Sequence, residues 1–156
     1  MNTFIKPDPW RLVEDHFDPS RVRSSESLFA LGNGVMGGRA NFEERYSGPS
    51  LQGNYIGGVY YPDKTRVGWW KNGYPEYFAK VLNAAFWIGV DVAVDGEPLD
   101  LAAAEVKSFY REMDMRRSVL TRRMTVVLRN GAEVAVEAVR FFSLARRELG
   151  VVKYAV

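Results

Sequence analysis

The sequence predicts a mostly β fold, an antiparallel β-sandwich. Two observations predict it. Short runs of alternating apolar and polar residues recur through the C-terminal half, and Asn-Gly or Asp-Gly pairs, which favour tight hairpin turns, separate them. Strands joined by hairpins form antiparallel sheets, which bury their apolar faces by packing as a sandwich. The chain has 156 residues, of which 47% are hydrophobic and 26% charged, a composition typical of one globular domain.

The first 24 residues are polar and contain three prolines, at positions 7, 9 and 19. They predict an extended leading segment with at most one helical turn, near residues 9–15. The sandwich domain is expected over residues 25–156. Asn33-Gly34 predicts a tight turn, and a strand is expected after it over residues 35–42. A further strand is expected over residues 51–61, ended by Pro62.

Residues 62–78 predict a long structured loop that is rich in aromatic side chains. Aromatic faces stack on sugar rings, and a nearby Lys can donate hydrogen bonds to sugar hydroxyls. The candidates for contact with a sugar are Tyr60, Tyr61, Trp69, Trp70, Lys71 and Tyr74. The alternative is that these rings hold the loop against the sandwich or dock a neighbouring domain. The sequence leaves both interpretations open.

The C-terminal half predicts five strands, closed by turns at Asp95-Gly96 and Asn130-Gly131. These strands are expected over residues 86–94, 105–113, 119–128, 133–141 and 149–156. One helical turn is expected at residues 101–104. The last strand runs to Val156 without a polar tail, so we expect the sequence to belong to a longer polypeptide.

Composition excludes several classes of partner. The net charge is +2, and arginines are interleaved with acidic residues, so nucleic acid is not expected. No apolar run is long enough for a membrane span, and no signal peptide is visible at the start. The chain has no cysteine, which together with these features suggests a cytoplasmic location. The one histidine, His16, has no nearby partners for a metal site or a triad.

Three motifs could be interpreted as parts of a catalytic site, but the sequence around each of them favours another interpretation. Residues 32–37 match G-x-G-x-x-G, but no βαβ unit surrounds them, so a tight turn is favoured over a dinucleotide site. Glu43 and Glu44 are adjacent, and in a strand they would point to opposite faces. Glu112 and Asp114 lie among arginines, and ion pairing is the simpler interpretation. No catalytic residue is predicted.

Several ordered stretches resemble the N-terminal part of glycoside hydrolase family 65, which contains maltose, trehalose and kojibiose phosphorylases and acid trehalases. The resemblance begins with residues 26–44, which contain Leu31-Gly-Asn-Gly-Val-Met-Gly-Gly-Arg39. It continues through residues 53–60, 94–100, 120–122 and 140–144. Phe86-Trp87 departs from the family pattern, which commonly has a proline before this tryptophan. Residues 61–76 look most like the maltose phosphorylase type.

The resemblance implies a galactose-mutarotase-like β-supersandwich, here truncated, which precedes a helical linker, an (α/α)6 barrel and a small C-terminal sheet domain. It implies an inverting reaction in which inorganic phosphate attacks an α-linked glucose disaccharide and yields β-glucose 1-phosphate, without metal or organic cofactor. The family's catalytic residues lie in the barrel and match nothing here. The expected partners are therefore that barrel, a second subunit of a homodimer and the disaccharide. The alternatives are a stand-alone carbohydrate-binding module and a purely structural interaction domain.

Overall fold

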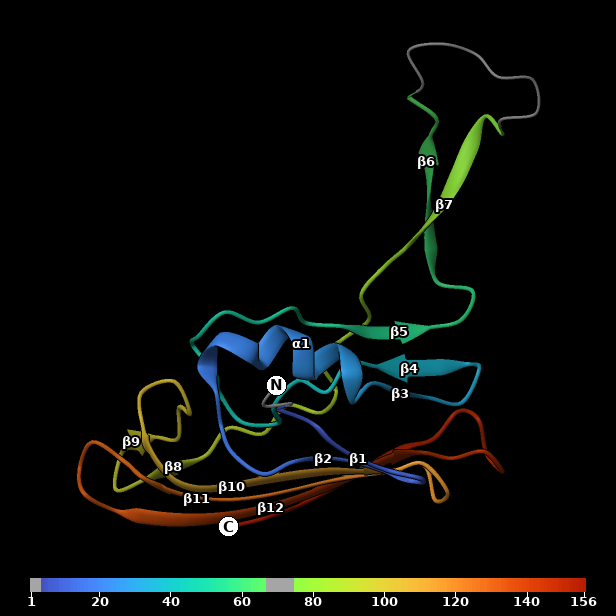
Figure 1. Cartoon of the computed structure of the whole chain (residues 1–156). Helices are drawn as coiled ribbons and strands as arrows, with labels where there is room; N and C mark the ends of the chain where they lie inside the picture. The colour runs from blue at the N-terminus through green and yellow to red at the C-terminus, as the bar shows by residue number, and fades with distance from the viewer. Residues whose placement is uncertain (1–3, 67–74) are drawn as a thin grey trace.

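A six-stranded antiparallel sheet is the largest element of the fold. The computed structural model of the chain describes residues 4–66 and 75–156. Neighbouring strands follow the order β1-β2-β10-β11-β12-β13 (Figure 1). The strands are β1 Lys6–Asp8, β2 Arg11–Glu14, β10 Glu105–Asp114, β11 Val119–Val127, β12 Glu133–Phe142 and β13 Gly150–Ala155. Each neighbouring pair is antiparallel, and the four strands predicted from residue 105 onward are confirmed.

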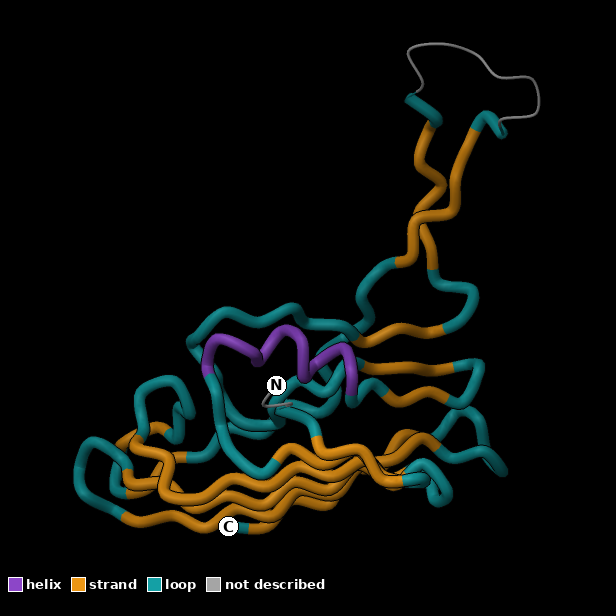
Figure 2. Tube along the Cα trace, in the orientation of Figure 1, coloured by secondary structure: helices purple, strands orange, loops and turns teal. Residues whose placement is uncertain are grey.

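A second layer covers one face of this sheet (Figure 2). It contains η1 (Pro19–Arg21), α1 (Val22–Leu28) and a three-stranded sheet. The strands of that sheet are β3 Leu31–Gly32, β4 Met36–Gly38 and β5 Asn54–Ile56. A short hairpin of β8 (Ala93–Val94) and β9 (Glu97–Pro98) lies near one end of the long strands (Figure 1). The mostly β, antiparallel sandwich predicted from the sequence is confirmed.

The core lies between the two layers, because alternate side chains of each long strand face inward. In β11 and β12 the inward residues include Met124, Val126 and Val136, each less than 5% exposed. Phe42 and Leu99 reach the same cluster from connecting segments. Complete burial of one such side chain contributes about 1.5–3 kcal/mol to folding. The strand periodicity therefore sets which face is covered.

The three predicted tight turns are confirmed. Asn33 caps the β3–β4 turn, since its side-chain oxygen accepts hydrogen bonds from the main-chain N–H groups of Val35 and Met36. Its amide also donates to the carbonyl of Ser143, 2.8 Å away, which ties this turn to the end of β12. Gly96 and Gly131 have φ values of 81° and 86°, the left-handed region that glycine adopts without strain.

Where at most one helical turn was expected, near residues 9–15, the chain is extended and forms β2, which pairs with β10. The α-helix instead occupies residues 22–28 and begins inside the segment that was predicted to be extended. Asp18 accepts a hydrogen bond from the N–H of Ser20, and Pro19 is the first residue of η1. Both features favour the start of a helix. The helical turn expected at residues 101–104 is present as a hydrogen-bonded turn.

The strand predicted over residues 86–94 is largely wrong, since only Ala93–Val94 is in a strand. Ile88 and Trp87 pack inward from an irregular segment. Ile88 is 2% exposed, and the Trp87 ring lies edge-on to Phe142 with centroids 5.6 Å apart. Further upstream, the predicted strand over 35–42 is limited to β4, and residues 51–61 contribute β5 and the start of β6 (Tyr60–Lys64). Within the described residues, no helix has the length and apolar character needed to cross a bilayer.

Candidate functional site

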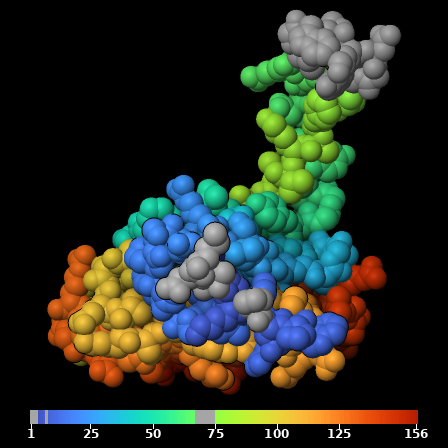
Figure 3. Space-filling view, viewed as in Figure 1, coloured from blue at the N-terminus to red at the C-terminus, as the bar shows by residue number. Residues whose placement is uncertain are grey.

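A two-stranded hairpin projects from the sandwich and carries the described candidates for sugar contact. It consists of β6 and β7 (Tyr77–Val81), paired antiparallel from Tyr60 opposite Val81 to Lys64 opposite Tyr77. Figures 1 and 3 show it standing away from the body of the molecule. An isolated two-stranded hairpin has little stability in water, so a projecting hairpin is expected to pack against the surface of a partner.

The hairpin register divides its side chains between two faces, because residues directly opposite each other share a face. One face is mainly apolar. It carries Tyr60, Pro62, Lys64, Tyr77, Ala79 and Val81. Val81 and Tyr60 are 65% and 56% exposed. This is a large amount of apolar surface to leave in water.

The other face carries Tyr61, Asp63, Phe78 and Lys80. Lys80 lies 2.5 Å from Asp63 and holds the pKa of that carboxyl below its usual range through their hydrogen bond. This face is more polar than the first.

Of the six sequence-predicted contact residues, Tyr60 and Tyr61 lie on β6 with exposed rings. Trp69, Trp70, Lys71 and Tyr74 lie outside the described residues. Residues 62–66 and 75–78 were expected in a loop, and the structure places most of them in the two hairpin strands. Adjacent positions such as Tyr60 and Tyr61 therefore point to opposite faces, so they do not form one stacking platform.

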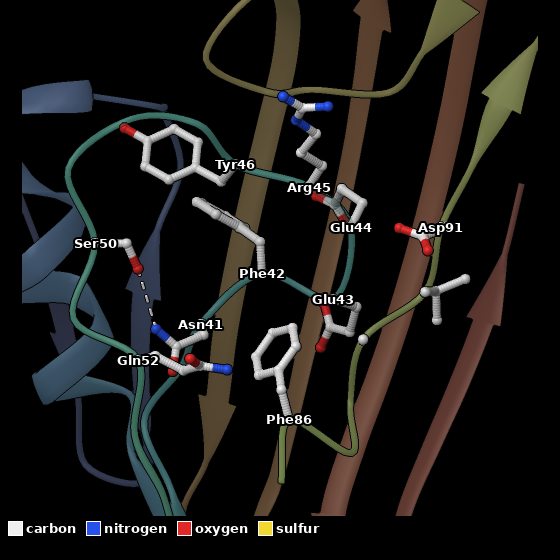
Figure 4. Close-up of a pocket in the computed structure, with 12 residues that line it drawn as sticks. Asn41, Phe42, Glu43, Glu44, Arg45, Tyr46, Ser50, Gln52, Phe86 and Asp91 are labelled. Carbon is white, nitrogen blue, oxygen red and sulfur yellow. Dashed lines mark hydrogen bonds between the residues drawn. The ribbon is translucent and has the colours of Figure 1, made fainter. Parts of the chain in front are cut away.

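An open cavity of about 620 Å³ lies between residues 41–52 and residues 86–91 (Figure 4). Its lining combines the Phe86 ring with the amides of Asn41 and Gln52 and the carboxylate of Asp91. Sequence reasoning missed this cavity, since two irregular segments far apart in the chain form it. The cavity also borders Glu43 and Glu44, whose chemistry decides what it can do.

Glu43 and Glu44 meet on one side chain instead of pointing to opposite faces. Nη2 of Arg122 lies 2.8 Å from Glu43 and 2.5 Å from Glu44. The expectation of opposite faces is wrong because these two residues lie in an irregular segment and not in a strand. Arg140 adds a second cation, 3.4 Å from Glu43. All four side chains are buried.

The charges around Glu43 favour its ionised form. Burial acts to raise the pKa of Glu43, but Arg122 and Arg140 outweigh it and leave this pKa below its usual value. The same two carboxylates raise the pKa of the Arg122 guanidinium, although its burial acts in the opposite direction. Burial lowers the pKa of nearby Arg111 to about 10. Glu43 is therefore charged near neutral pH and pairs with Arg122 and Arg140.

The other sequence candidates have ordinary roles. Glu112 pairs with Arg11 of β2 at 3.6 Å, and Asp114 accepts hydrogen bonds from the main-chain N–H groups of Arg116 and Arg117. His16 is exposed beside Asp15. Within residues 4–66 and 75–156, no group of three or more His, Cys, Asp or Glu could hold a metal ion. The glycines at 32 and 37 pair across the β3–β4 hairpin, which confirms the turn interpretation.

Comparisons with known proteins give a consistent result. The sequence profile described as glycosyl hydrolase family 65, N-terminal domain, matches residues 12–156. A maltose phosphorylase of Bacillus subtilis (strain 168) is 49% identical over 147 residues, which cover 94% of this chain and 19% of that protein. A kojibiose phosphorylase of Thermoanaerobacter brockii is 29% identical over 143 residues, 92% of this chain and 17% of the relative.

A solved structure from the human microbiome, assigned as a kojibiose phosphorylase, superimposes with a TM-score of 0.80 at 29% identity. The match covers 91% of this chain and 19% of that structure. The chain thus spans about a fifth of the length of the relatives it matches.

Proposed function

The chain belongs to the N-terminal domain family of glycosyl hydrolase family 65, and from this premise we propose that it is a non-catalytic domain of a longer phosphorylase. The proposed parent cleaves an α-linked glucose disaccharide of the maltose type. Inorganic phosphate attacks the anomeric carbon from the face opposite the leaving group, and a carboxylic acid protonates the departing sugar oxygen. The products are β-glucose 1-phosphate and the free second sugar, and the reaction requires neither metal nor organic cofactor.

The shared binding of Glu43 and Glu44 to Arg122 carries the non-catalytic part of this proposal. A general acid for glycosidic cleavage must hold a proton near neutral pH, which requires a raised pKa. Glu43 has a lowered pKa. Both carboxylates are also buried and paired with one guanidinium. The acids that the fold brings together therefore support the sandwich and leave catalysis to other parts of the parent.

Within this proposal, the β6–β7 hairpin joins the sandwich to the rest of the parent polypeptide. Its apolar face around Tyr60 and Val81 is suited to dock on the catalytic barrel. The more polar face around Tyr61 is suited to the rim of a sugar site. The marginal stability of a free two-stranded hairpin supports such a docked state.

A stand-alone carbohydrate-binding module is the second candidate, and the exposed rings of Tyr60 and Tyr61 favour it. Titration of the 156-residue chain with maltose, followed by intrinsic fluorescence and calorimetry, distinguishes the two. Saturable binding by the isolated chain that Tyr61→Ala abolishes would support the module. A domain that only contributes a rim to a barrel site shows no saturation at millimolar sugar.

The full-length parent provides the test of the proposed reaction. Incubation with maltose and inorganic phosphate is expected to release glucose and β-glucose 1-phosphate in equal amounts, with the anomer assigned from the NMR coupling of its anomeric proton. Release of two glucose molecules without consumption of phosphate would contradict phosphorolysis. Formation of the α-anomer would contradict inversion.

A further inference from the structure

Two short segments, residues 57–59 and 82–84, connect the β6–β7 hairpin to the sandwich. The first continues from the end of β5, and the second returns past Asn54, the first residue of β5 (Figure 2). β5 itself pairs with β4, so it belongs to the sandwich. The hydrogen bonds of these two segments therefore set the direction in which the hairpin leaves the sandwich.

The main-chain groups of Asn54 hold the returning segment, residues 82–84. Along a strand of an antiparallel sheet, main-chain groups point alternately toward one neighbour and the other. The N–H of Arg39 donates to the carbonyl of Gly53 at 2.8 Å, so the main-chain groups of Asn54 point away from β4. The N–H of Asn54 donates to Oδ1 of Asn83 at 3.1 Å, and its carbonyl accepts from the N–H of Ala84 at 2.7 Å. Both groups are thus satisfied as if a further strand were paired there.

The segment that follows β5 is held through the main chain. The N–H of Gly57 donates to the carbonyl of Val35 at 2.6 Å, in the turn between β3 and β4. Of the three hydrogen bonds at the base of the hairpin, the one accepted by Asn83 involves a side chain. Asn54 is buried, so its N–H depends on Asn83 for a partner. Replacement of Asn83 therefore loosens the returning segment and leaves the other two bonds in place.

We propose that Asn83 is a positioning residue for the sugar site to which the β6–β7 hairpin contributes in the parent. This inference rests on the proposed function, in which the polar face around Tyr61 lies at the rim of that site. Asn83 fixes the returning segment on β5, and Lys80, three residues earlier, is directly opposite Tyr61 in the hairpin. In this role Asn83 contacts no substrate and acts through the place that it gives to Tyr61.

The two kinetic constants of the parent separate a positioning role from a purely structural one. A rim residue contacts the sugar in the bound substrate and in the transition state alike, so loss of this contact raises KM and leaves kcat nearly unchanged. A substitution that only lowers stability reduces the amount of folded enzyme. Such a loss lowers the apparent kcat and leaves KM as it was.

The test compares variants of the full-length parent in the phosphorolysis of maltose. Asn83→Ala removes the acceptor and is expected to raise KM for maltose about fivefold, the factor that corresponds to one hydrogen bond. Asn83→Asp keeps an Oδ1 acceptor and is expected to retain the KM of the wild type. Asn130→Ala is the matched control, because Asn130 accepts a similar bond from the N–H of Ala132 at 3.0 Å in the turn between β11 and β12. Its KM is expected to stay unchanged.

A double-mutant cycle tests whether Asn83 acts through Tyr61. Tyr61→Ala alone is expected to raise KM for maltose. Addition of Asn83→Ala is then expected to raise it little further, because the contact that Asn83 positions is already lost. If the two changes in KM simply multiply, Asn83 does not act through Tyr61 and the proposal is overturned.

Amide hydrogen exchange of the parent provides a readout that does not depend on turnover. Exchange in β6 and β7 is expected to be faster in Asn83→Ala than in Asn130→Ala, because the base of the hairpin opens more often. Equal exchange in the two variants would contradict the role of Asn83 at this base.

The outcomes distinguish failure of this inference from failure of the proposed function. An active parent whose folded Asn83→Ala variant keeps the KM of the wild type would overturn the inference and leave the proposed function in place. A folded parent that does not phosphorolyse maltose would overturn the proposed function, and the positioning role would fall with it.

Discussion

The hydroxyl of Tyr154 donates a hydrogen bond to Oε2 of Glu44 at 3.1 Å and joins residues 110 positions apart. Arg122 binds the same carboxylate from β11. The edge strand β13, the strand β11 and the irregular segment around Glu44 are therefore held by one buried polar centre. The charges of this centre must stay paired to remain buried.

Arg122→Met tests this centre. It leaves Glu43 and Glu44 buried without their shared cation, so we expect the free energy of unfolding to fall by about 3–5 kcal/mol. Urea denaturation followed by circular dichroism measures the change. Arg123→Met is the matched control on the next residue, because Arg123 is exposed and pairs with Glu137 at 2.9 Å. Its expected cost is about 0–1 kcal/mol. Equal losses in the two variants would contradict a structural role for the buried pair.

The lowered pKa of Glu43 predicts how stability depends on pH. A carboxyl with a lower pKa in the folded than in the unfolded chain contributes stability above the unfolded value, near 4.5, and loses it as the pH falls through the folded value. The free energy of unfolding is therefore expected to fall with acidification below about pH 4.5. Glu43→Gln is expected to lower the free energy of unfolding at neutral pH and to make its decrease with acidification shallower. Urea titrations at a series of pH values measure both effects. If the free energy of unfolding of this variant falls with acidification as steeply as that of the wild type, Glu43 is not responsible for the pH dependence.

Tyr154→Phe removes the hydroxyl and retains the ring. We expect a loss of about 1 kcal/mol, the net value of one hydrogen bond, because Arg122 still satisfies the same carboxylate oxygen. Tyr61→Phe serves as the control, since that side chain is exposed on the hairpin, and its effect is expected to stay within about 0.5 kcal/mol. Thermal unfolding of both variants provides the comparison. A larger loss for Tyr61→Phe would contradict this assignment.

Gly131→Ala tests the turn between β11 and β12. The φ of 86° is unfavourable for a residue with a Cβ atom, so a cost of about 1–2 kcal/mol is expected. Gly131→Asn is expected to cost less, because asparagine tolerates the left-handed region. Apart from the adjacent residues, no atom lies within 4 Å of the position that a Cβ atom would take, so the cost measures backbone conformation and not a clash. An alanine variant as stable as the wild type would contradict this conformation.

The strands and turns that were predicted correctly depend only on residues that are close to each other along the chain. The alternation from Glu105 onward is local, and it correctly gave the four long strands. The turns at Asn33-Gly34 and Asn130-Gly131 are also local. The contact of Glu43 and Glu44 with Arg122 was beyond such reasoning, because the partner lies 79 and 78 positions later in the chain. The stretch from Phe86 was mistaken for a strand because it is rich in apolar residues, of which Ile88 enters the core from an irregular path.

In the proposed function, this chain supports a reaction that other parts of the parent carry out. The most direct test is the purified 156-residue chain with maltose and inorganic phosphate, assayed for β-glucose 1-phosphate beside the full-length parent. We predict no product above the enzyme-free control from the chain, and steady product formation by the parent. Turnover by the chain alone that Glu43→Gln abolishes would contradict the account.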